Sequence, residues 1–238
     1  MMKIYAAILL CTAMCAVPAG VSAEPADKSL PESAARMHDY LAAVSQIKDA
    51  IIRGDLPGTH EPARWLAEHA APEETPAGWH SHVEGVRVAA RSMLTAKDFR
   101  AAAMLVTEMA DTCGACHEGN RVTNNFAVPP APGDELAAVA HMQRHGWAAD
   151  RMWEGLIGPS DVAWQQGTEL LLETPLAAHE MGTDDNGAFR IRRWAMRVHE
   201  LAADGRLAED PGQRADIYAE LLTICAACHR RLGRGPQR

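Results

Sequence analysis

The chain has 238 residues, of which 47% are hydrophobic and 5% aromatic, and its formal net charge is −8. The acidic balance argues against nucleic-acid binding, which needs basic surface. Alanine is abundant and alternating apolar runs are almost absent, so the composition predicts an all-α protein with one large domain or two of ordinary size.

The first residues have the features of an export signal. Lys3 supplies a positive charge, an apolar run covers residues 4–17, and a "VSA" cleavage site follows. The run is shorter than the ~20 residues of a membrane-spanning helix. We therefore expect residues 1–23 to be removed as a signal peptide together with Cys11 and Cys15, which leaves no membrane span and places the protein in the periplasm.

The remaining chain divides into two halves with the same plan. The segment "NNFAVPPAPGDE" contains three prolines and a glycine, so it is a natural linker. Each half ends with one Cys-x-x-Cys-His motif, and such self-similarity indicates related modules. We predict two tandem four-helix bundles, 24–123 and 135–238, joined by a Pro-rich linker at 124–134, and we expect each bundle to fold separately.

Four helices are predicted in the first half. Apolar residues recur at helical spacing, Gly54 ends the first helix, Thr59 can cap the second, and Thr95 with Asp98 makes a capping box for the fourth. The predicted helices cover residues 31–53, 61–69, 79–94 and 96–119.

Four helices are also predicted in the second half. Asp134, Ser160 and Asp210 are candidate N-caps, Pro211 suits the first position of the last helix, and Gly187 opens the third. The predicted helices cover residues 135–156, 161–173, 187–202 and 211 to the second motif.

The cysteine motifs carry the chemistry. The first motif is Cys113, Cys116 and His117, and the second is Cys225, Cys228 and His229. On a helix, positions i, i+3 and i+4 share one face, so each motif directs two thiols and one imidazole at the same object. This pentapeptide is typical of c-type haem attachment, with thioether bonds from the cysteines and iron ligation by the histidine. We therefore predict two covalently bound haem c groups.

Two other interpretations use the same residues. A redox-active disulfide of thioredoxin type belongs at a helix start near a strand, whereas these motifs end terminal helices. A shared zinc site would need two cysteine pairs that lie over a hundred residues apart in the sequence. Both motifs are complete and use every cysteine of the mature chain, which favours haem.

A four-helix module with Cys-x-x-Cys-His near the end of its last helix resembles the cytochrome c-prime family and its low-spin relatives. The resemblance covers the mature chain as a tandem duplication. The family often has an aromatic and then a basic residue after the haem histidine. Here Arg121 takes the basic position while Asn120 replaces the aromatic residue, and the second copy has Leu232 and Gly233 there.

The second axial position of each iron decides between electron transfer and ligand binding. Met37 and Met142 lie on apolar stripes early in the first helix of each half, where low-spin members of the resembled family place a methionine ligand. A methionine on such a stripe is otherwise core filler. His145 is the best alternative in the second half, because it lies on the stripe one turn after Met142, and the tryptophans are expected mainly to pack within the bundles.

These features predict an exported di-haem cytochrome that passes single electrons between redox partner proteins and is not an enzyme. The alternatives are a five-coordinate protein that binds nitric oxide or carbon monoxide, and a di-haem peroxidase, which needs an open iron beside an acid–base residue.

Overall fold

The computed structural model describes residues 29–122, 124, 126–133, 135, 137–172 and 185–233. This part of the chain is all-helical, with eight α-helices and no strand, which confirms the all-α prediction. None of its helices is long and apolar enough to cross a membrane. The predicted signal peptide at 1–23 and the predicted cap Asp134 lie outside the described residues.

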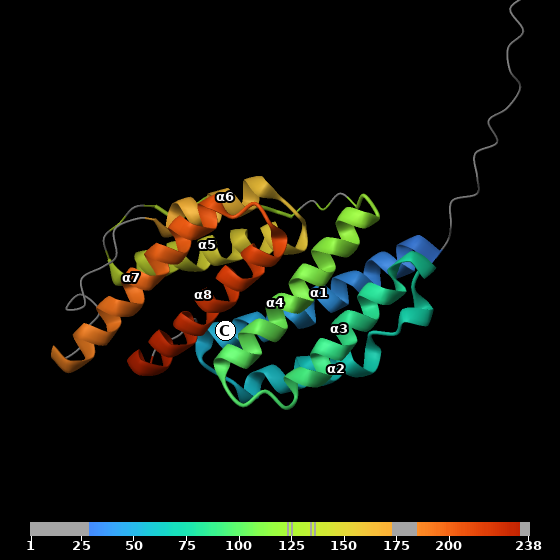
Figure 1. The fold of residues 1–238 in the computed structure, drawn as a ribbon, viewed down its shortest axis with the longest axis horizontal. Helices are drawn as coiled ribbons and strands as arrows, with labels where there is room; N and C mark the ends of the chain where they lie inside the picture. Colours follow the sequence, from blue (N-terminus) through green and yellow to red (C-terminus); the bar gives the residue numbers. More distant parts are fainter. Residues whose placement is uncertain are drawn as a thin grey trace, which may run out of the picture.

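The eight helices match the predicted plan of four in each half (Figure 1). Three single turns of 3₁₀-helix, at Pro57–Thr59, Pro72–Glu74 and Ala77–Trp79, connect elements of the first half. The α-helices are α1 (Ser29–Arg53), α2 (His60–His69), α3 (His80–Met93), α4 (Phe99–Gly119), α5 (Ala138–Ile157), α6 (Asp161–Leu171), α7 (Asp185–Leu207) and α8 (Pro211–Leu232).

Side-chain caps set the start of three helices. The carboxylate of Asp98 accepts a hydrogen bond from the third residue of α4, and Ser160 and Asp210 do the same for α6 and α8. Pro211 occupies the first position of α8, where its missing N–H costs nothing. Gly54 has a φ of +73°, a left-handed conformation that ends α1 as predicted.

Other predicted helix ends differ from those in the structure. The Thr95 capping box is wrong, because Asp98 alone caps α4 and the Thr95 hydroxyl donates to the carbonyl of Ser92. Thr59 precedes α2, but its hydroxyl donates back to Leu56 instead of accepting from the helix. Short hydroxyl side chains readily satisfy nearby carbonyls in this way. In addition, α5 begins at Ala138 and α7 at Asp185, so neither begins at the predicted residue.

The two halves pack against each other along α4 and α8. These helices run antiparallel, because the Arg230 guanidinium near the end of α8 lies 5.4 Å from the ring of Phe99 at the start of α4. Helix α8 also packs on α1, and α4 packs on α5, so four helices meet between the halves (Figure 1). Fully buried side chains of both halves, including Ile47, Val106 and Met152, belong to one continuous core.

Two side-chain contacts between α1 and α5 also cross this boundary. The ammonium group of Lys48, which is 4% exposed, binds the carboxylate of Asp150. Reciprocally, the indole N–H of Trp153 donates to the hydroxyl of Ser45 at 3.3 Å. Ser45 and Asp150 occupy equivalent positions of the two halves, and so do Lys48 and Trp153. The same two positions therefore meet twice across the boundary. The boundaries predicted for two domains therefore stay a prediction. The described residues of both halves share one core.

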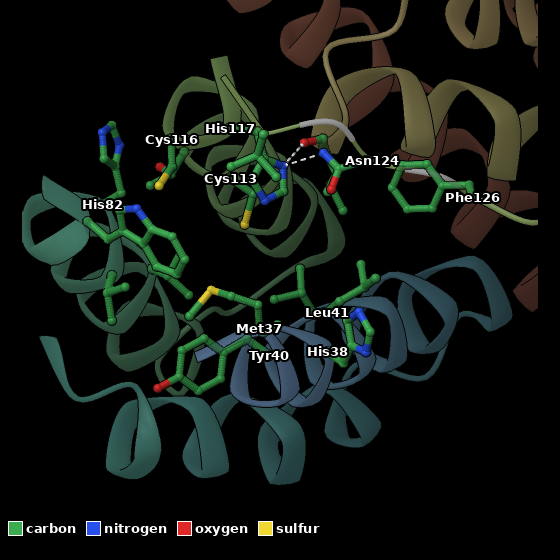
Figure 2. A pocket seen from close by; sticks show the side chains of 18 of the residues that line it. Met37, His38, Tyr40, Leu41, His82, Cys113, Cys116, His117, Asn124 and Phe126 are labelled. Carbon is green, nitrogen blue, oxygen red and sulfur yellow. Dashed lines mark hydrogen bonds between the residues drawn. The ribbon is translucent and has the colours of Figure 1, made fainter. Parts of the chain in front are cut away.

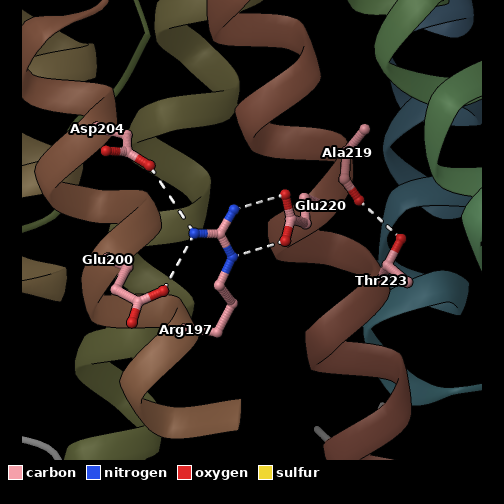
Figure 3. Close-up of polar contacts among 6 residues, drawn as sticks. All are labelled: Arg197, Glu200, Asp204, Ala219, Glu220 and Thr223. Carbon is pink, nitrogen blue, oxygen red and sulfur yellow. Dashed lines mark hydrogen bonds and ion pairs between the residues drawn. The ribbon is translucent and has the colours of Figure 1, made fainter. Parts of the chain in front are cut away.

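Helix α7 is attached to α8 by a network of charges (Figure 3). The Arg197 guanidinium donates to both carboxylate oxygens of Glu220, at 2.7 and 2.9 Å, and to Glu200 at 3.1 Å. Asp204 lies 3.9 Å from the same group. The hydrogen bond from Arg197 lowers the pKa of Glu220 and raises that of Arg197. Both side chains are partly exposed, so solvent weakens the pair.

Separate chains covering 24–133 and 135–238, expressed together with export signals, should purify as one complex. The reason is that α4, α8, α1 and α5 bury apolar surface against one another across the linker. Affinity purification through a tag on one chain, followed by size-exclusion chromatography, shows whether the two chains form this complex. Two chains that fold but elute independently would contradict the shared core.

Arg197→Ala should lower the free energy of unfolding by about 1 kcal/mol or less at pH 7, since the pair is bidentate but partly exposed. Glu220 has a lowered pKa in the folded state, so its stabilisation is present above its ordinary pKa and is lost as the pH falls through the lowered value. Denaturant melts should therefore show the difference shrinking below about pH 4. Arg193, an exposed residue of the same helix, provides the control. Arg193→Ala should change the free energy of unfolding less than Arg197→Ala does at pH 7, and the change should not depend on the titration of Glu220.

Candidate functional site

The first motif lies on the last two turns of α4 and borders a cavity of about 660 Å³ (Figure 2). The side chains of Cys113, Cys116 and His117 all line it, as the i, i+3, i+4 spacing predicts. Met37 on α1 lines the same cavity, so the four residues predicted for this site come together. The volume lies within the range of small-molecule and cofactor sites.

The cavity walls are mainly apolar. Leu41 and Val44 of α1 and Val83 and Val86 of α3 form much of the lining, and the Trp79 ring lies beside them. Trp79 therefore contributes to this wall in addition to packing. Such a lining favours an apolar ligand. The polar residues His38, Tyr40, His82, Thr112 and Asn124 also line it.

The His117 imidazole is oriented by a backbone carbonyl. Its Nδ1 lies 2.7 Å from the carbonyl oxygen of Ile157, the last residue of α5. A carbonyl can only accept, so Nδ1 carries a proton, and the neutral imidazole then has its lone pair on Nε2. This is the tautomer that a histidine needs in order to bind a metal through Nε2, with its other nitrogen hydrogen-bonded.

Part of the predicted linker forms another wall. Asn124, Phe126 and Ala127 line the cavity, and the Asn124 side-chain amide nitrogen lies 2.9 Å from Nδ1 of His117 (Figure 2). Because Nδ1–H donates to Ile157, the Asn124 NH₂ group contacts Nδ1 without donating to it. Further along, Trp147 of α5 donates to the carbonyl of Pro129 at 3.0 Å and holds the linker against the second half. The sequence analysis missed these wall residues, because proline content indicates a break in the helix without showing where the segment packs.

Burial keeps the motif thiols protonated. It raises the pKa of Cys113 to about 12, and it also raises the pKa of Cys116. The four described cysteines are free thiols. Redox-active dithiols need a lowered thiol pKa, so these environments do not favour a thioredoxin-type reaction.

The second motif, at the end of α8, has the same histidine–carbonyl contact and the same buried thiols as the first. Nδ1 of His229 lies 2.6 Å from the carbonyl oxygen of Ile52, near the end of α1. Burial lowers the pKa of His229, which favours the neutral imidazole that a metal ligand requires. Burial also raises the pKa of Cys225 to about 12 and that of Cys228 to about 11.

Helix α5 carries both residues predicted as candidate ligands for the second site, Met142 and His145. Met142 is half-buried on this helix, and its position as a ligand stays a prediction. His145 is near enough to His229 for the two imidazoles to interact electrostatically. Burial, followed by the charges of His141, Arg144 and His229, lowers the pKa of His145 to about 3. His145 is therefore a neutral imidazole beside the second motif.

The two motifs lie at opposite ends of the antiparallel pair α4 and α8. His229 is next to Arg230, which contacts Phe99, whereas His117 is at the far end of α4. At about 1.5 Å of rise per residue, the helix from Phe99 to His117 is about 27 Å long. Zinc ligands lie within about 2.3 Å of the metal, so the two cysteine pairs cannot share one zinc ion.

The fold and site define an all-helical protein with two separate thiol-and-imidazole sites, each at the end of a helix. No family model matches the chain, and comparisons with curated proteins and with solved structures gave no match. The interpretation of the site therefore depends on its own geometry.

Proposed function

We propose that the chain is a di-haem c-type cytochrome, made of two tandem four-helix modules, that carries single electrons between redox partner proteins in the periplasm. The observation that carries the proposal is the convergence of Cys113, Cys116, His117 and Met37 on one apolar cavity. Two thiols, one imidazole and one thioether are the groups that attach and ligate haem c in a low-spin cytochrome.

The residues of the first site fit a haem group in three respects. The cavity is large and largely apolar, the imidazole presents its Nε2 lone pair, and the thiols are unpaired. Haem iron supplies reversible one-electron chemistry, with a potential set by its axial ligands. Within this site, Cys113 and Cys116 hold the group by thioether bonds, His117 ligates from α4, and Met37 ligates from α1.

The second site is proposed on the repeat of the motif and of its carbonyl contact. Cys225 and Cys228 provide the attachment and His229 provides the proximal ligand. Met142 is the proposed second ligand by its equivalence to Met37, and His145 is the competing residue. Because the motifs lie at opposite ends of α4 and α8, we propose that each site exchanges electrons with partners at its own end of the molecule.

The exported protein should carry two haem groups. Each of the four thiols adds across one vinyl group, so no atoms are lost, and the denatured protein should have the mass of residues 24–238 plus two haems. Intact-mass spectrometry of protein from cells that mature c-type cytochromes measures this. Cys113→Ala with Cys116→Ala should leave one covalent haem, and a bare chain with two disulfides would contradict the proposal.

Met37→Ala should make the iron held by His117 high-spin, let it bind carbon monoxide and lower its reduction potential. Thioether sulfur is a soft ligand that stabilises ferrous iron, and its removal opens a coordination position. Met142→Ala should do the same at the iron held by His229. Optical spectra and potentiometric titration measure both effects.

Met93→Ala is the matched control, since Met93 is fully buried in the same half but does not line the cavity. It should cost about 2–5 kcal/mol of stability and leave the spectrum unchanged. Unchanged low-spin spectra in Met37→Ala would make Met37 core filler. High-spin iron in both halves of the unmodified protein would favour the gas-binding alternative over electron transfer.

A further inference from the structure

The ends of α1 and α5 each contact the motif histidine of the opposite half. The carbonyl of Ile52, in the first half, accepts from His229, and the carbonyl of Ile157, in the second half, accepts from His117. The last four carbonyl groups of a helix have no partner within it, so these two are available as acceptors. They also lie at the negative end of the helix dipole, which favours a proton donor there.

The same two helices reach both sites. Met37 is separated from Ile52 by as many residues as Met142 is from Ile157, and both stretches are four turns of helix. Helix α1 therefore lines the first site with Met37 and contacts the histidine of the second site with Ile52. Helix α5 carries His145 next to the second site and contacts the histidine of the first.

We infer that each iron site is shared between the halves, with the helix end of the opposite half positioning the axial histidine and setting its electron donation. The inference rests on the proposed function, because it concerns the histidine as an iron ligand. A hydrogen bond from Nδ1–H to an acceptor fixes the ring and makes Nε2 a more basic ligand. A more basic ligand stabilises ferric iron, so this contact lowers the reduction potential.

Gly114 makes the contact at the first site possible. A Cβ atom at this position would lie 2.3 Å from the carbonyl oxygen of Leu156, which is backbone and cannot rotate away. This glycine, the first of the two residues between the motif cysteines, thus allows α4 to approach the end of α5. At the second site Gly54 also lies against α8, where a Cβ would meet Cγ of the Arg230 side chain at 2.3 Å and the carbonyl oxygen of Ala226 at 3.1 Å. Gly114 is therefore a positioning residue.

Gly114→Ala in the full-length protein with both haems attached should displace the end of α5 and lengthen the bond between His117 and Ile157. The potential of the iron held by His117 should shift upward, while that held by His229 should not move. In proton NMR, the His117 Nδ1–H should lose protection from solvent exchange. Ala115→Ser, at the exposed neighbouring position of the same motif, is the matched control and should change neither measurement.

Asn124→Asp should strengthen the acceptor for the His117 Nδ1–H, whereas Gly114→Ala weakens it. This variant does not require any helix to repack. The Asn124 side chain lies 2.9 Å from Nδ1, so a carboxylate in its place would offer Nδ1–H an anionic acceptor that the amide nitrogen does not provide, and it should shift the same potential downward. Asn120→Asp places an equal charge at the end of α4, where Asn120 bonds to the carbonyl of Cys116, and should give a smaller shift.

The outcomes separate the two proposals. A protein without covalent haem would overturn the proposed function. A protein that carries both haems, but whose first potential and Nδ1–H exchange are unchanged in Gly114→Ala and Asn124→Asp, would overturn the shared-site inference and leave the function intact. If Gly114→Ala does not fold, Nδ1–H exchange in the unmodified protein decides instead, because rapid solvent exchange of the His117 proton would overturn the inference. Equal shifts from Asn124→Asp and Asn120→Asp would overturn the part of the inference that concerns electron donation.

Discussion

Two hydrogen bonds, from His117 to the carbonyl of Ile157 and from His229 to that of Ile52, define the relation between the halves and the candidate sites. Each requires the end of one half's first helix to reach the last helix of the other half. The antiparallel packing of α4 and α8, and the approach allowed by Gly114, provide this arrangement. The backbone that holds the halves together also fixes the tautomer of each motif histidine.

The packing between the halves explains why these bonds can persist. Hydrogen bonds contribute about 1 kcal/mol each, so they cannot by themselves hold two large units in register. The shared core, and the contacts of Lys48 with Asp150 and of Trp153 with Ser45, hold α1 and α5 in place beside the motif histidines. The buried ammonium of Lys48 keeps an acidic partner, which a charge in this position requires.

The geometry also accounts for how the sites would differ. The first cavity faces Met37, whereas the neutral imidazole of His145 lies beside the second motif. Axial ligand type is a main determinant of haem potential. Two sites at opposite ends of one helix pair suit the proposed exchange of electrons with separate partners better than one continuous internal relay.

Local chemistry could be read from the sequence alone. The helix pattern, the caps Ser160 and Asp210, and the common face of each Cys-x-x-Cys-His motif follow from periodicity and from bonds between residues three or four apart. The roles of Ile52, Ile157 and Asn124, and the need for glycine at position 114, depend on contacts between residues distant in the chain. A backbone carbonyl has no side-chain signature, so only the packing of the two halves revealed which carbonyl meets which histidine.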